Sequence, residues 1–359
     1  MNTEERLELI KQVGEEIIGE DELIELLKSG RELIAYDGFE PSGRIHIAQG
    51  LMRAINVNKL TKADVRFKFW VADWFGLINN KMGGDLEKIR TVGEYFIEVW
   101  KACGMDLSKV EFIWASDSMN QDYWLGVLKI GMLNSVTRIT RCSQIMGRSE
   151  KDSLSAAQIF YPCMQAQDIF FLHADIAQLG MDQRKVNVLA REVAPKLGLK
   201  KPIAIHNHML MGLTKPKDEG LSGVEAAVAK KMSKSNPDSC IFMTDTKEEI
   251  IKKFNKAYCL EGVVEDNPVL EYCKYIVFER MDVIKEFVVE RPEKFGGTVK
   301  YKTYEQLEKD FVEKKLHPAD LKASTAKYID QLLEPVRKHF AENKYAKDLL
   351  EKVNGYYKN

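Results

Sequence analysis

Short apolar runs alternate with longer stretches of helical periodicity through the first two-thirds of the chain. The apolar runs predict strands at 33–36, 65–72, 110–115 and 203–205. Amphipathic stretches predict helices at 45–60, 162–174 and 182–197. Because strands alternate with helices, we expect an α/β domain over residues 1–240, built on a doubly wound parallel sheet. The segment from about 116 to 155 interrupts the alternation and predicts a helical insertion.

The last third of the chain has a different pattern, in which strand signals nearly vanish. Periodic apolar positions predict helices at 247–256, 268–278 and 319–340. A chain of 359 residues is long for one compact core and suits two domains. We therefore expect a second, all-α domain over residues 241–359, joined to the first through the loop at 235–239.

Composition narrows the class of protein. Apolar residues make up 45% and charged residues 30% of the chain, as in soluble globular proteins. No apolar run is long enough for a membrane span, and the acidic N-terminus does not resemble a signal peptide, so we expect a cytoplasmic protein without membrane contact. The six cysteines form no CxxC pair, which argues against zinc and against disulfides. A net charge of −1 means that any RNA contact must use local basic patches.

The first candidate motif is PSGRIHIAQG at 41–50, which follows a predicted strand and opens a predicted helix. Unpaired backbone N–H groups and the helix dipole make such a junction an anion site. His46 and Gln49 are three residues apart, so both lie on one helix face. The pattern fits binding of nucleotide phosphates. The alternative is an ordinary turn with a surface histidine.

The second candidate motif is KKMSKS at 230–235. Closely spaced lysines and hydroxyls on a loop suit a pyrophosphate leaving group, because Lys231 and Lys234 would neutralise the charge that grows there in the transition state. The alternative is a solvated basic loop.

The third candidate motif is YPCMQAQDI at 161–169, which is predicted to open a helix with Pro162 in its first turn. Tyr161, Gln165 and Asp168 fall at i, i+4 and i+7 and share one helix face. A tyrosine, an amide and a carboxylate aligned in this way indicate a polar binding site, although a solvated stripe has the same pattern. Asp73 ends a predicted central strand and either faces the same pocket or caps a helix.

KMSKS matches the second nucleotide-binding motif of class I aminoacyl-tRNA synthetases, and the His46 segment resembles their first, HIGH-type motif. Ala48 and Gln49 depart from the HIGH pattern, and Gln49 can donate a hydrogen bond but cannot carry a proton charge. YPxMQxxDI and the later MDQRK at 181–185 resemble the archaeal and eukaryotic branch of tyrosyl-tRNA synthetases. The resemblance covers about residues 36–334 and implies a Rossmann-type catalytic domain.

The resemblance also implies roles for individual residues. Tyr36 and Asp168 would bracket the phenol hydroxyl of a tyrosine substrate, and Tyr161, Gln165 and Gln183 would hold its α-ammonium group. Catalysis would depend on His46, Gln49, Lys231 and Lys234. ATP, with magnesium carried on its phosphates, would meet a set of glycine, histidine, lysine and serine positions: Gly38, Gly43, His46, Gly50, Lys231, Ser233 and Lys234.

The helical domain is expected to meet tRNA. The segment LHPADLK at 316–322 resembles the anticodon-binding segment of the family, with Asp320 as the base reader; without the resemblance it is typical of an ordinary helix start. Lys252, Lys253 and Lys256 fit phosphate contacts or a solvated face equally well. The family pattern further implies a homodimer that uses apolar residues of the insertion: Trp124, Leu125, Val127, Leu128, Met132 and Leu133.

Three alternatives stay open from the sequence. A tryptophanyl-tRNA synthetase is the close sibling, although the pairing of Tyr36 with Asp168 and the Asp182–Gln183 motif speak against it. An adenylyltransferase for another cofactor would share a HIGH-like helix but does not need KMSKS. A non-catalytic relative would act as an RNA-binding or signalling module, and the intact His46, Lys231 and Lys234 weigh against that interpretation.

Overall fold

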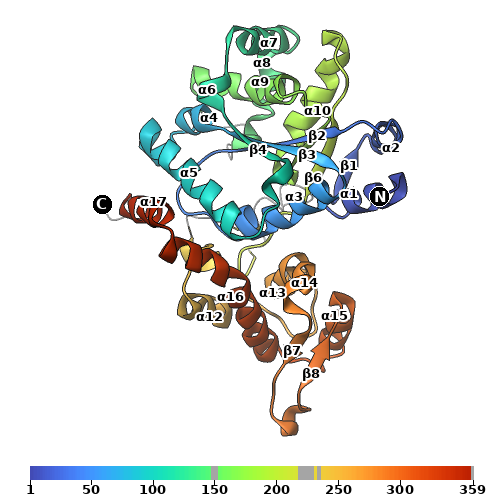
Figure 1. Cartoon of the computed structure of the whole chain (residues 1–359), viewed down its shortest axis with the longest axis vertical. Helices are drawn as coiled ribbons and strands as arrows, with labels where there is room; N and C mark the ends of the chain where they lie inside the picture. Colours follow the sequence, from blue (N-terminus) through green and yellow to red (C-terminus); the bar gives the residue numbers. More distant parts are fainter. Residues whose placement is uncertain (147–152, 217–229, 233–235, 357–359) are drawn as a thin grey trace.

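The computed structural model describes residues 1–146, 153–216, 230–232 and 236–356. Its centre is a six-stranded sheet in the order β1-β6-β5-β2-β3-β4 (Figure 1). All neighbouring strands pair in parallel except β1 and β6, which are antiparallel. The strands are β1 Glu16–Ile18, β2 Leu33–Phe39, β3 Val65–Val71, β4 Val110–Trp114, β5 Ile176–Gly180 and β6 Ile203–Asn207.

The winding of the sheet reverses between β2 and β5. From β2 the chain proceeds through β3 and β4 on one side, and it then returns to add β5 and β6 on the other side. In open α/β sheets, ligands bind in the crevice at the carboxyl ends of the two strands where this reversal occurs. The predicted Rossmann-type fold is confirmed, and it places the crevice after Phe39 and Gly180.

Helices cover both faces of the sheet (Figure 1). The side chains of each strand alternate between the faces, so neighbouring residues enter different cores. Phe69 belongs to one buried cluster and Trp70 to the other. Tyr36 lies in the second cluster with α9 and α10. The covering helices are α1 Thr3–Lys11, α3 Arg53–Lys62 and α5 Leu86–Ala102 on one face, and α4 Asp73–Ile78, α9 Ala156–Phe171 and α10 Arg184–Val193 on the other; α2 Glu20–Lys28 lies near the β1 edge.

The predicted insertion is mostly helical over its described residues. It contains α6 Ala115–Ser118, α7 Gln121–Met132, α8 Val136–Thr140 and a short turn, η4 Ser143–Met146. Helix α7 packs closely on α9, because a Cβ at Gly126 would lie 2.3 Å from the Gln167 side chain. The inner face of α7 buries Tyr123 and Val127, so Val127 is not available to a partner, contrary to the prediction. Its outer face exposes Leu125, Leu128 and Met132 by 47%, 54% and 87%.

The C-terminal part lies below the sheet domain (Figure 1). Its helices are α12 Lys247–Lys256, α13 Pro268–Tyr272, α14 Met281–Ile284, α15 Tyr304–Val312, α16 Pro318–Glu342 and α17 Lys344–Gly355. It also holds a two-stranded antiparallel ribbon, β7 Phe287–Val289 and β8 Val299–Tyr301, which the sequence analysis did not predict. Strands of three residues are too short to show the alternation that marks a longer strand.

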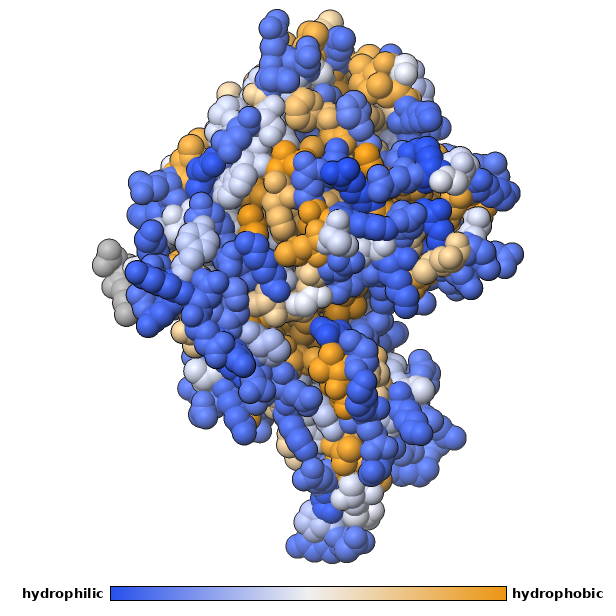
Figure 2. Space-filling model, in the orientation of Figure 1, coloured by the Kyte–Doolittle hydropathy of each residue, from blue (hydrophilic) through white to orange (hydrophobic). Residues whose placement is uncertain are grey.

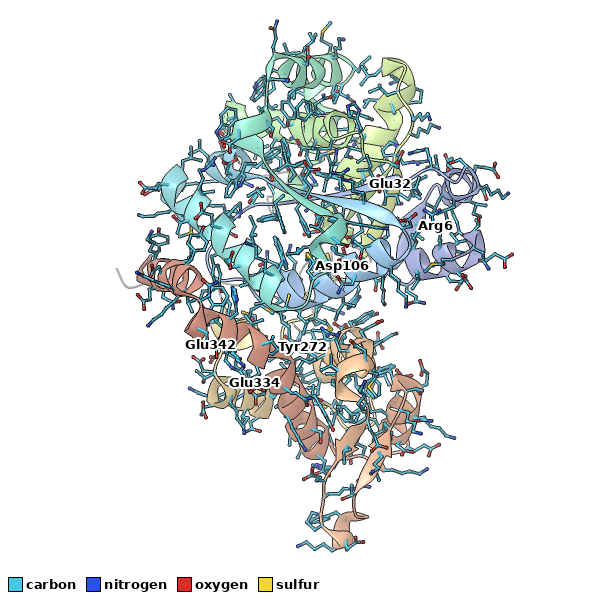
Figure 3. The ribbon with its side chains drawn as sticks, viewed as in Figure 1. Arg6, Glu32, Asp106, Tyr272, Glu334 and Glu342 are labelled. Atoms are coloured by element: carbon cyan, nitrogen blue, oxygen red, sulfur yellow. The ribbon has the colours of Figure 1, made fainter. Side chains whose placement is uncertain are left out.

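The two parts are joined by extensive packing. Tyr272 of α13 lies at the junction and is fully buried (Figure 3). Helix α17 returns to the catalytic part and packs along α5, where Tyr345 donates a 2.9 Å hydrogen bond to Glu94. Hydrophobic side chains gather in the middle of the face shown in Figure 2, and its outline is mostly hydrophilic. One buried cluster accordingly runs from the sheet into the C-terminal helices.

Candidate active site

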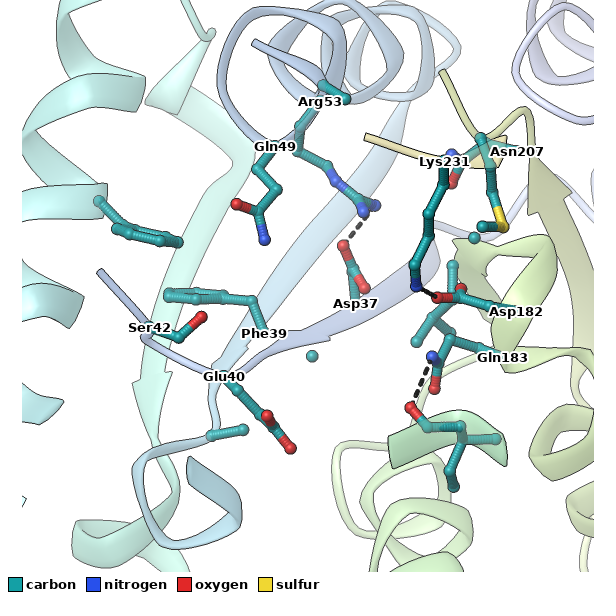
Figure 4. A pocket seen from close by; sticks show the side chains of 18 of the residues that line it. Asp37, Phe39, Glu40, Ser42, Gln49, Arg53, Asp182, Gln183, Asn207 and Lys231 are labelled. Carbon is teal, nitrogen blue, oxygen red and sulfur yellow. Dashed lines mark hydrogen bonds and ion pairs between the residues drawn. The ribbon is translucent and has the colours of Figure 1, made fainter. Parts of the chain in front are cut away.

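A cavity of about 320 Å³ opens at the carboxyl ends of β2 and β5, where the sheet winding reverses (Figure 4). Residues from both groups proposed on sequence grounds line this one cavity. Those expected to hold tyrosine are Tyr36, Tyr161, Gln165, Asp168 and Gln183, and those expected to meet ATP are Gly38, His46, Gln49 and Lys231. The fold thus brings residues together that are up to 195 positions apart in the sequence.

The His46 segment is held against the chain that follows the lysine motif. The amide of Ile47 donates to Ile241 O over 2.8 Å, and the amide of Met243 donates to Ile45 O over 3.0 Å. The helix therefore begins later than predicted, with a π-helical turn, η1 Ala48–Met52, that continues into α3. This pairing also shows that residues 241–243 pack with the sheet domain, just past the boundary expected at residue 240.

Two of the glycines expected to meet ATP do not line the cavity. Gly43 adopts a φ of 64°, a conformation that favours glycine, and it turns the chain before His46. Gly50 is buried against Met243, whose side chain would lie 2.5 Å from an added Cβ. Gly43 and Gly50 therefore affect the backbone of the motif and do not line the cavity, whereas Gly38 does.

His46 and Gln49 both line the cavity. The backbone amide of Gln49 donates to His46 Nδ1 over 3.4 Å, which leaves Nε2 of a neutral ring as the protonated nitrogen. The backbone carbonyl of Gln49 accepts a 2.9 Å hydrogen bond from Trp100 of α5. The Oε1 atom of Gln49 is buried and has no hydrogen-bond partner in the described part of the chain. Its side-chain amide lies over the cavity in Figure 4, available to a ligand.

Lys231 reaches the cavity from the lysine motif. Its Nζ lies 2.9 Å from Oδ2 of Asp182, at the opposite rim from Gln49 (Figure 4). Met232 is buried beside it. Ser233 and Lys234, which were predicted to bind ATP, lie outside the described residues.

The buried end of the cavity carries a carboxylate between two phenols. Asp168 Oδ2 accepts a 3.2 Å hydrogen bond from Tyr36, and Oδ1 accepts a 2.7 Å hydrogen bond from Tyr123. All three side chains are at most 1% exposed. Burial raises the pKa of Asp168 well above its usual value, and the hydrogen bonds from Tyr123 and Tyr36 act in the opposite direction. Tyr123 was missed in the sequence, since it comes from the insertion, 45 residues before Asp168.

The side chains expected at the α-ammonium group form the next wall. Helix α9 begins at Ala156 with a capping box at Ser155, so Pro162 lies inside the helix. The prediction that Pro162 lies in the first turn of the helix is therefore wrong. Gln165 donates a 3.0 Å hydrogen bond to Gln183. Gln183, labelled in Figure 4, donates in turn to Ile145 O over 3.1 Å. Tyr161 donates to Glu40, a carboxylate of the cavity wall that the sequence analysis did not select.

A buried polar network that the sequence did not predict supports the floor of the cavity. Arg53 of α3 forms an ion pair with Asp37 of β2 and donates a 3.2 Å hydrogen bond to Gln178 of β5. Gln178 donates to Asn207 over 2.8 Å. Burial raises the pKa of Asp37 to about 6, and the charge of Arg53 opposes this rise. The network crosses the point where the strand order reverses and ties β2, β5 and β6 to the helix after His46.

Asp73 does not line the cavity. It is fully buried, accepts 2.6 Å and 3.0 Å hydrogen bonds from the side chain and amide of Ser116, and lies 3.2 Å from Arg90. Its carboxylate also accepts from the amide of Trp74. Asp73 therefore holds the start of the insertion in place. Neither of its two predicted places is found, because it does not line the cavity and the N-cap of α4 is Ala72.

In the C-terminal part, Asp320 lies in the first turn of α16 and is partly exposed. The helix is capped by His317, whose Nδ1 accepts a 3.1 Å hydrogen bond from the amide of Ala319, so the cap does not require Asp320. Lys253 forms a 2.6 Å ion pair with the fully buried Asp245, which excludes both interpretations given for it from sequence. Lys252 and Lys256 are exposed.

No group of three or more His, Cys, Asp or Glu side chains in the described ranges is placed to hold a metal ion. Nor is any described helix long and apolar enough to cross a bilayer.

Comparison with known proteins identifies the class to which this fold and cavity belong. The family model for tRNA synthetases class I (W and Y) matches residues 28–334. The chain belongs to this family. The chain is 53% identical over 357 residues to tyrosine–tRNA ligase 1, cytoplasmic, of Arabidopsis thaliana, and the match covers 98% of this chain and 89% of the relative.

Solved structures of tyrosyl-tRNA synthetases resemble the chain in both sequence and fold. Tyrosyl-tRNA synthetase from Pyrococcus horikoshii, in complex with L-tyrosine, is 40% identical with a TM-score of 0.90, covering 98% of this chain and all of that one. Leishmania major tyrosyl-tRNA synthetase with tyrosinol is 47% identical with a TM-score of 0.90; this chain matches it over its whole length but spans 53% of it. Tryptophanyl-tRNA synthetase from Aeropyrum pernix, at 18% identity and a TM-score of 0.67, shares the fold alone. Within the class, the chain is thus a member of the tyrosine–tRNA ligases.

Proposed function

We propose that the cavity between β2 and β5 joins tyrosine to ATP, giving tyrosyl-adenylate and pyrophosphate, and that the tyrosyl group then passes to the 3′ end of tRNA. The observation that carries the proposal is that one cavity is lined by both groups of residues, those suited to a phenol amino acid and those suited to nucleotide phosphates. In the first step the tyrosine carboxylate attacks the α-phosphate, and in the second a ribose hydroxyl displaces AMP. No protein nucleophile is required, so catalysis consists of positioning and charge stabilisation.

Tyrosine would enter with its phenol towards Asp168. The hydroxyl of the substrate would take a place between Tyr36 and Asp168, whose side chains now lie 3.2 Å apart. A phenol both donates and accepts, so a carboxylate acceptor and a phenol donor satisfy it. Phenylalanine would leave these buried groups unpaired; tyrosyl-tRNA synthetases are themselves the known example of this effect, with discrimination of roughly 10⁵-fold, a magnitude that does not come from the present geometry. Tyr161, Gln165 and Gln183 would hold the α-ammonium group.

ATP would lie towards His46, Gln49 and Lys231. The Nε2 proton of His46 and the amide of Gln49 are donors for phosphate oxygens, and Lys231 supplies positive charge at the opposite rim. Ser233 and Lys234 continue the same motif, and Gly38 allows close approach of the nucleotide, with Gly43 and Gly50 in support. The magnesium expected with ATP would be held by the phosphates.

The C-terminal part, residues 241–359, is proposed to bind the anticodon of tRNA, and residues 1–240 to carry both chemical steps. Support comes from Asp320, which lies in a helix turn away from the cavity and is not needed as the cap of that helix. A carboxylate there would accept hydrogen bonds from the N–H groups of an unstacked base.

A homodimer is proposed through the outer face of α7. Leu125, Leu128 and Met132 expose apolar side chains on one helix, with Trp124 and Leu133 beside them. Contiguous apolar surface of this kind marks interaction sites. We also propose a cytoplasmic location, because the Arabidopsis relatives carry that description in their names.

Pyrophosphate exchange measured separately with each amino acid tests the function directly. Purified protein should exchange pyrophosphate into ATP with tyrosine and barely with phenylalanine or tryptophan. Equal exchange with tryptophan would overturn the substrate assignment, and no exchange with any amino acid would favour a non-catalytic RNA-binding role.

A further inference from the structure

A short segment of backbone fixes where Lys231 enters the cavity. Lys231 forms an antiparallel bridge with Met211, and the amide of Met232 donates to Leu210 O over 3.1 Å. The position of the lysine side chain therefore follows the position of residues 210–211. These residues come shortly after β6, whose last residue, Asn207, also lines the cavity.

Glu271 binds this segment from outside the cavity. It lies on α13, in the C-terminal part, and its Oε2 accepts a 2.9 Å hydrogen bond from the amide of Met211. The same oxygen lies 3.0 Å from Nε2 of His208. A buried backbone amide that loses such a carboxylate acceptor is left unsatisfied, which makes the contact costly to remove.

His208 is shared between Glu271 and a second carboxylate. Its Nδ1 is hydrogen-bonded to Glu15, which precedes β1, and its ring stacks on Tyr275 with centroids 4.1 Å apart. Burial opposes the charge on the ring, but the two carboxylates prevail and raise the pKa of His208 to about 9. The Glu15 carboxylate binds His208, whereas Glu271 binds both His208 and the backbone of Met211. The two carboxylates thus form a natural pair for comparison.

The other strand of the bridge is anchored to the C-terminal part as well. Lys230, next to Lys231, has its Nζ 2.6 Å and 2.7 Å from the two carboxylate oxygens of Asp266. Asp266 lies just before α13, which carries Glu271. One region of the C-terminal part therefore holds both backbone segments that meet at the Lys231–Met211 bridge.

We propose that Glu271 is a positioning residue for the activation of tyrosine: by holding the backbone of Met211, it keeps Lys231 directed at the phosphates of ATP. The proposal rests on the proposed function, since it assumes that Lys231 acts on ATP in this cavity. Groups that assist catalysis need support that fixes them within fractions of an ångström. The C-terminal part accordingly contributes to the first chemical step, in the absence of tRNA.

Three variants of the full chain separate positioning from simple attachment of the two parts. Glu271→Met keeps the side-chain length and removes the acceptor; Glu271→Gln keeps an oxygen that can accept from Met211. Glu15→Met, the matched control, removes the other carboxylate from His208. In tyrosine-dependent pyrophosphate exchange, Glu271→Met should lower kcat/KM for ATP by about 10-fold or more, with the KM for tyrosine within about twofold of wild type. Glu271→Gln should recover most of the loss, and Glu15→Met should show none of it.

Equal losses of ATP kcat/KM in Glu271→Met and Glu15→Met would overturn the proposal, as would a lower Tm with unchanged ATP kinetics in Glu271→Met. Should Glu271→Met fail to fold, Lys230→Met tests the same support, because it removes the donor to Asp266; an unchanged kcat/KM for ATP in that variant would also overturn the proposal. A wild-type protein without tyrosine-dependent exchange would instead refute the proposed function, so the two failures are distinguishable.

Discussion

Tyr123 donates a 2.7 Å hydrogen bond to Asp168 Oδ1, while Tyr36 donates to the other oxygen of the same carboxylate. The bond joins the insertion to the deepest part of the cavity, because Tyr123 lies on α7 and Asp168 on α9. The exposed apolar face of the same helix is formed by Leu125, Leu128 and Met132. One helix therefore carries both a support for the proposed tyrosine-recognition carboxylate and the surface proposed for dimerisation.

Removing the Tyr123 hydroxyl tests this support. In Tyr123→Phe, Asp168 loses a donor inside an apolar site, and a buried group left unsatisfied costs about 1–3 kcal/mol. We expect kcat/KM for tyrosine in pyrophosphate exchange to fall roughly 5- to 150-fold, and discrimination against phenylalanine to narrow. Tyr345→Phe, which removes an exposed hydroxyl bonded to Glu94, serves as the control. Unchanged discrimination in Tyr123→Phe would show that Tyr36 alone suffices to hold Asp168.

His46 is predicted to act on the transition state and not on tyrosine binding. Its Nε2 proton, fixed by the contact of Nδ1 with the Gln49 amide, would donate to a phosphate oxygen as charge develops. His46→Ala should lower the rate of adenylate formation by roughly 10²-fold or more, as for the loss of one transition-state donor. Stopped-flow measurement of adenylate formation, with tyrosine affinity measured in parallel, checks both halves. A variant that binds tyrosine poorly but keeps its rate would contradict the role.

The outer face of α7 is predicted to hold two copies of the chain together. Leu125→Glu with Leu128→Glu should yield monomers in sedimentation velocity, since both side chains are about half exposed and their replacement need not disturb the core. Circular dichroism should show a folded variant. If the wild-type protein itself sediments as a monomer, the apolar face has another occupant and the dimer proposal fails.

His208 should make stability depend on pH in the alkaline range. Burial disfavours the charge of His208, but Glu15 and Glu271 raise its pKa from 6.5 to about 9. Tyr275, which stacks on the His208 ring, and Lys274 lie on the same helix turn, Cys273–Val277. A pKa raised on folding stabilises the protein fully below 6.5, and this contribution is lost as pH rises through 9. The loss amounts to roughly 3 kcal/mol between pH 6 and 10. Urea unfolding of wild type and His208→Gln should therefore converge at high pH; a constant difference would contradict the prediction.

The sequence predicted those elements whose residues are strongly patterned. Strands β2, β3, β4 and β6 were each recovered within three residues at either end, because short runs rich in apolar and aromatic residues mark strands. Strand β5 was missed, since Gln178 interrupts its apolar run, and β1 was missed because its three residues are only half buried. The start of α9 was placed too late because Pro162 was interpreted as a first-turn residue.

The site followed the same rule. Motifs located residues that act from one segment, such as His46 with Gln49, or Tyr161 with Gln165 and Asp168. Residues that act through distant partners were not predictable, because no local pattern links Tyr123 to Asp168 or Asp37 to Arg53. Asp73 shows the reverse error. Its place after a central strand suggested that it faces the pocket, but its carboxylate binds Ser116 and Arg90.

Asp320 is predicted to read an anticodon base. Its carboxylate can only accept hydrogen bonds, which suits the exposed N–H groups of an unstacked base such as guanine. Asp320→Ala should raise the KM for tRNA in charging and leave tyrosine-dependent pyrophosphate exchange intact, because that step involves no anticodon contact. By analogy with direct readout in DNA, the lost contact would cost about 1–3 kcal/mol.

The competing explanation for Asp320 is structural, and the capping geometry sharpens the test. Since His317 caps α16, Asp320→Ala should remove only a favourable interaction with the helix dipole, typically about 0.3–1 kcal/mol of stability. His317→Ala is the matched variant: it removes the cap, costs about 1 kcal/mol of stability, and leaves the carboxylate in place. Charging of normal tRNA should then be compared with charging of tRNA that carries a substituted first anticodon base. A base reader predicts that Asp320→Ala loses discrimination between the two tRNAs while His317→Ala retains it. If Asp320→Ala discriminates as well as wild type, the carboxylate serves the helix and not the anticodon.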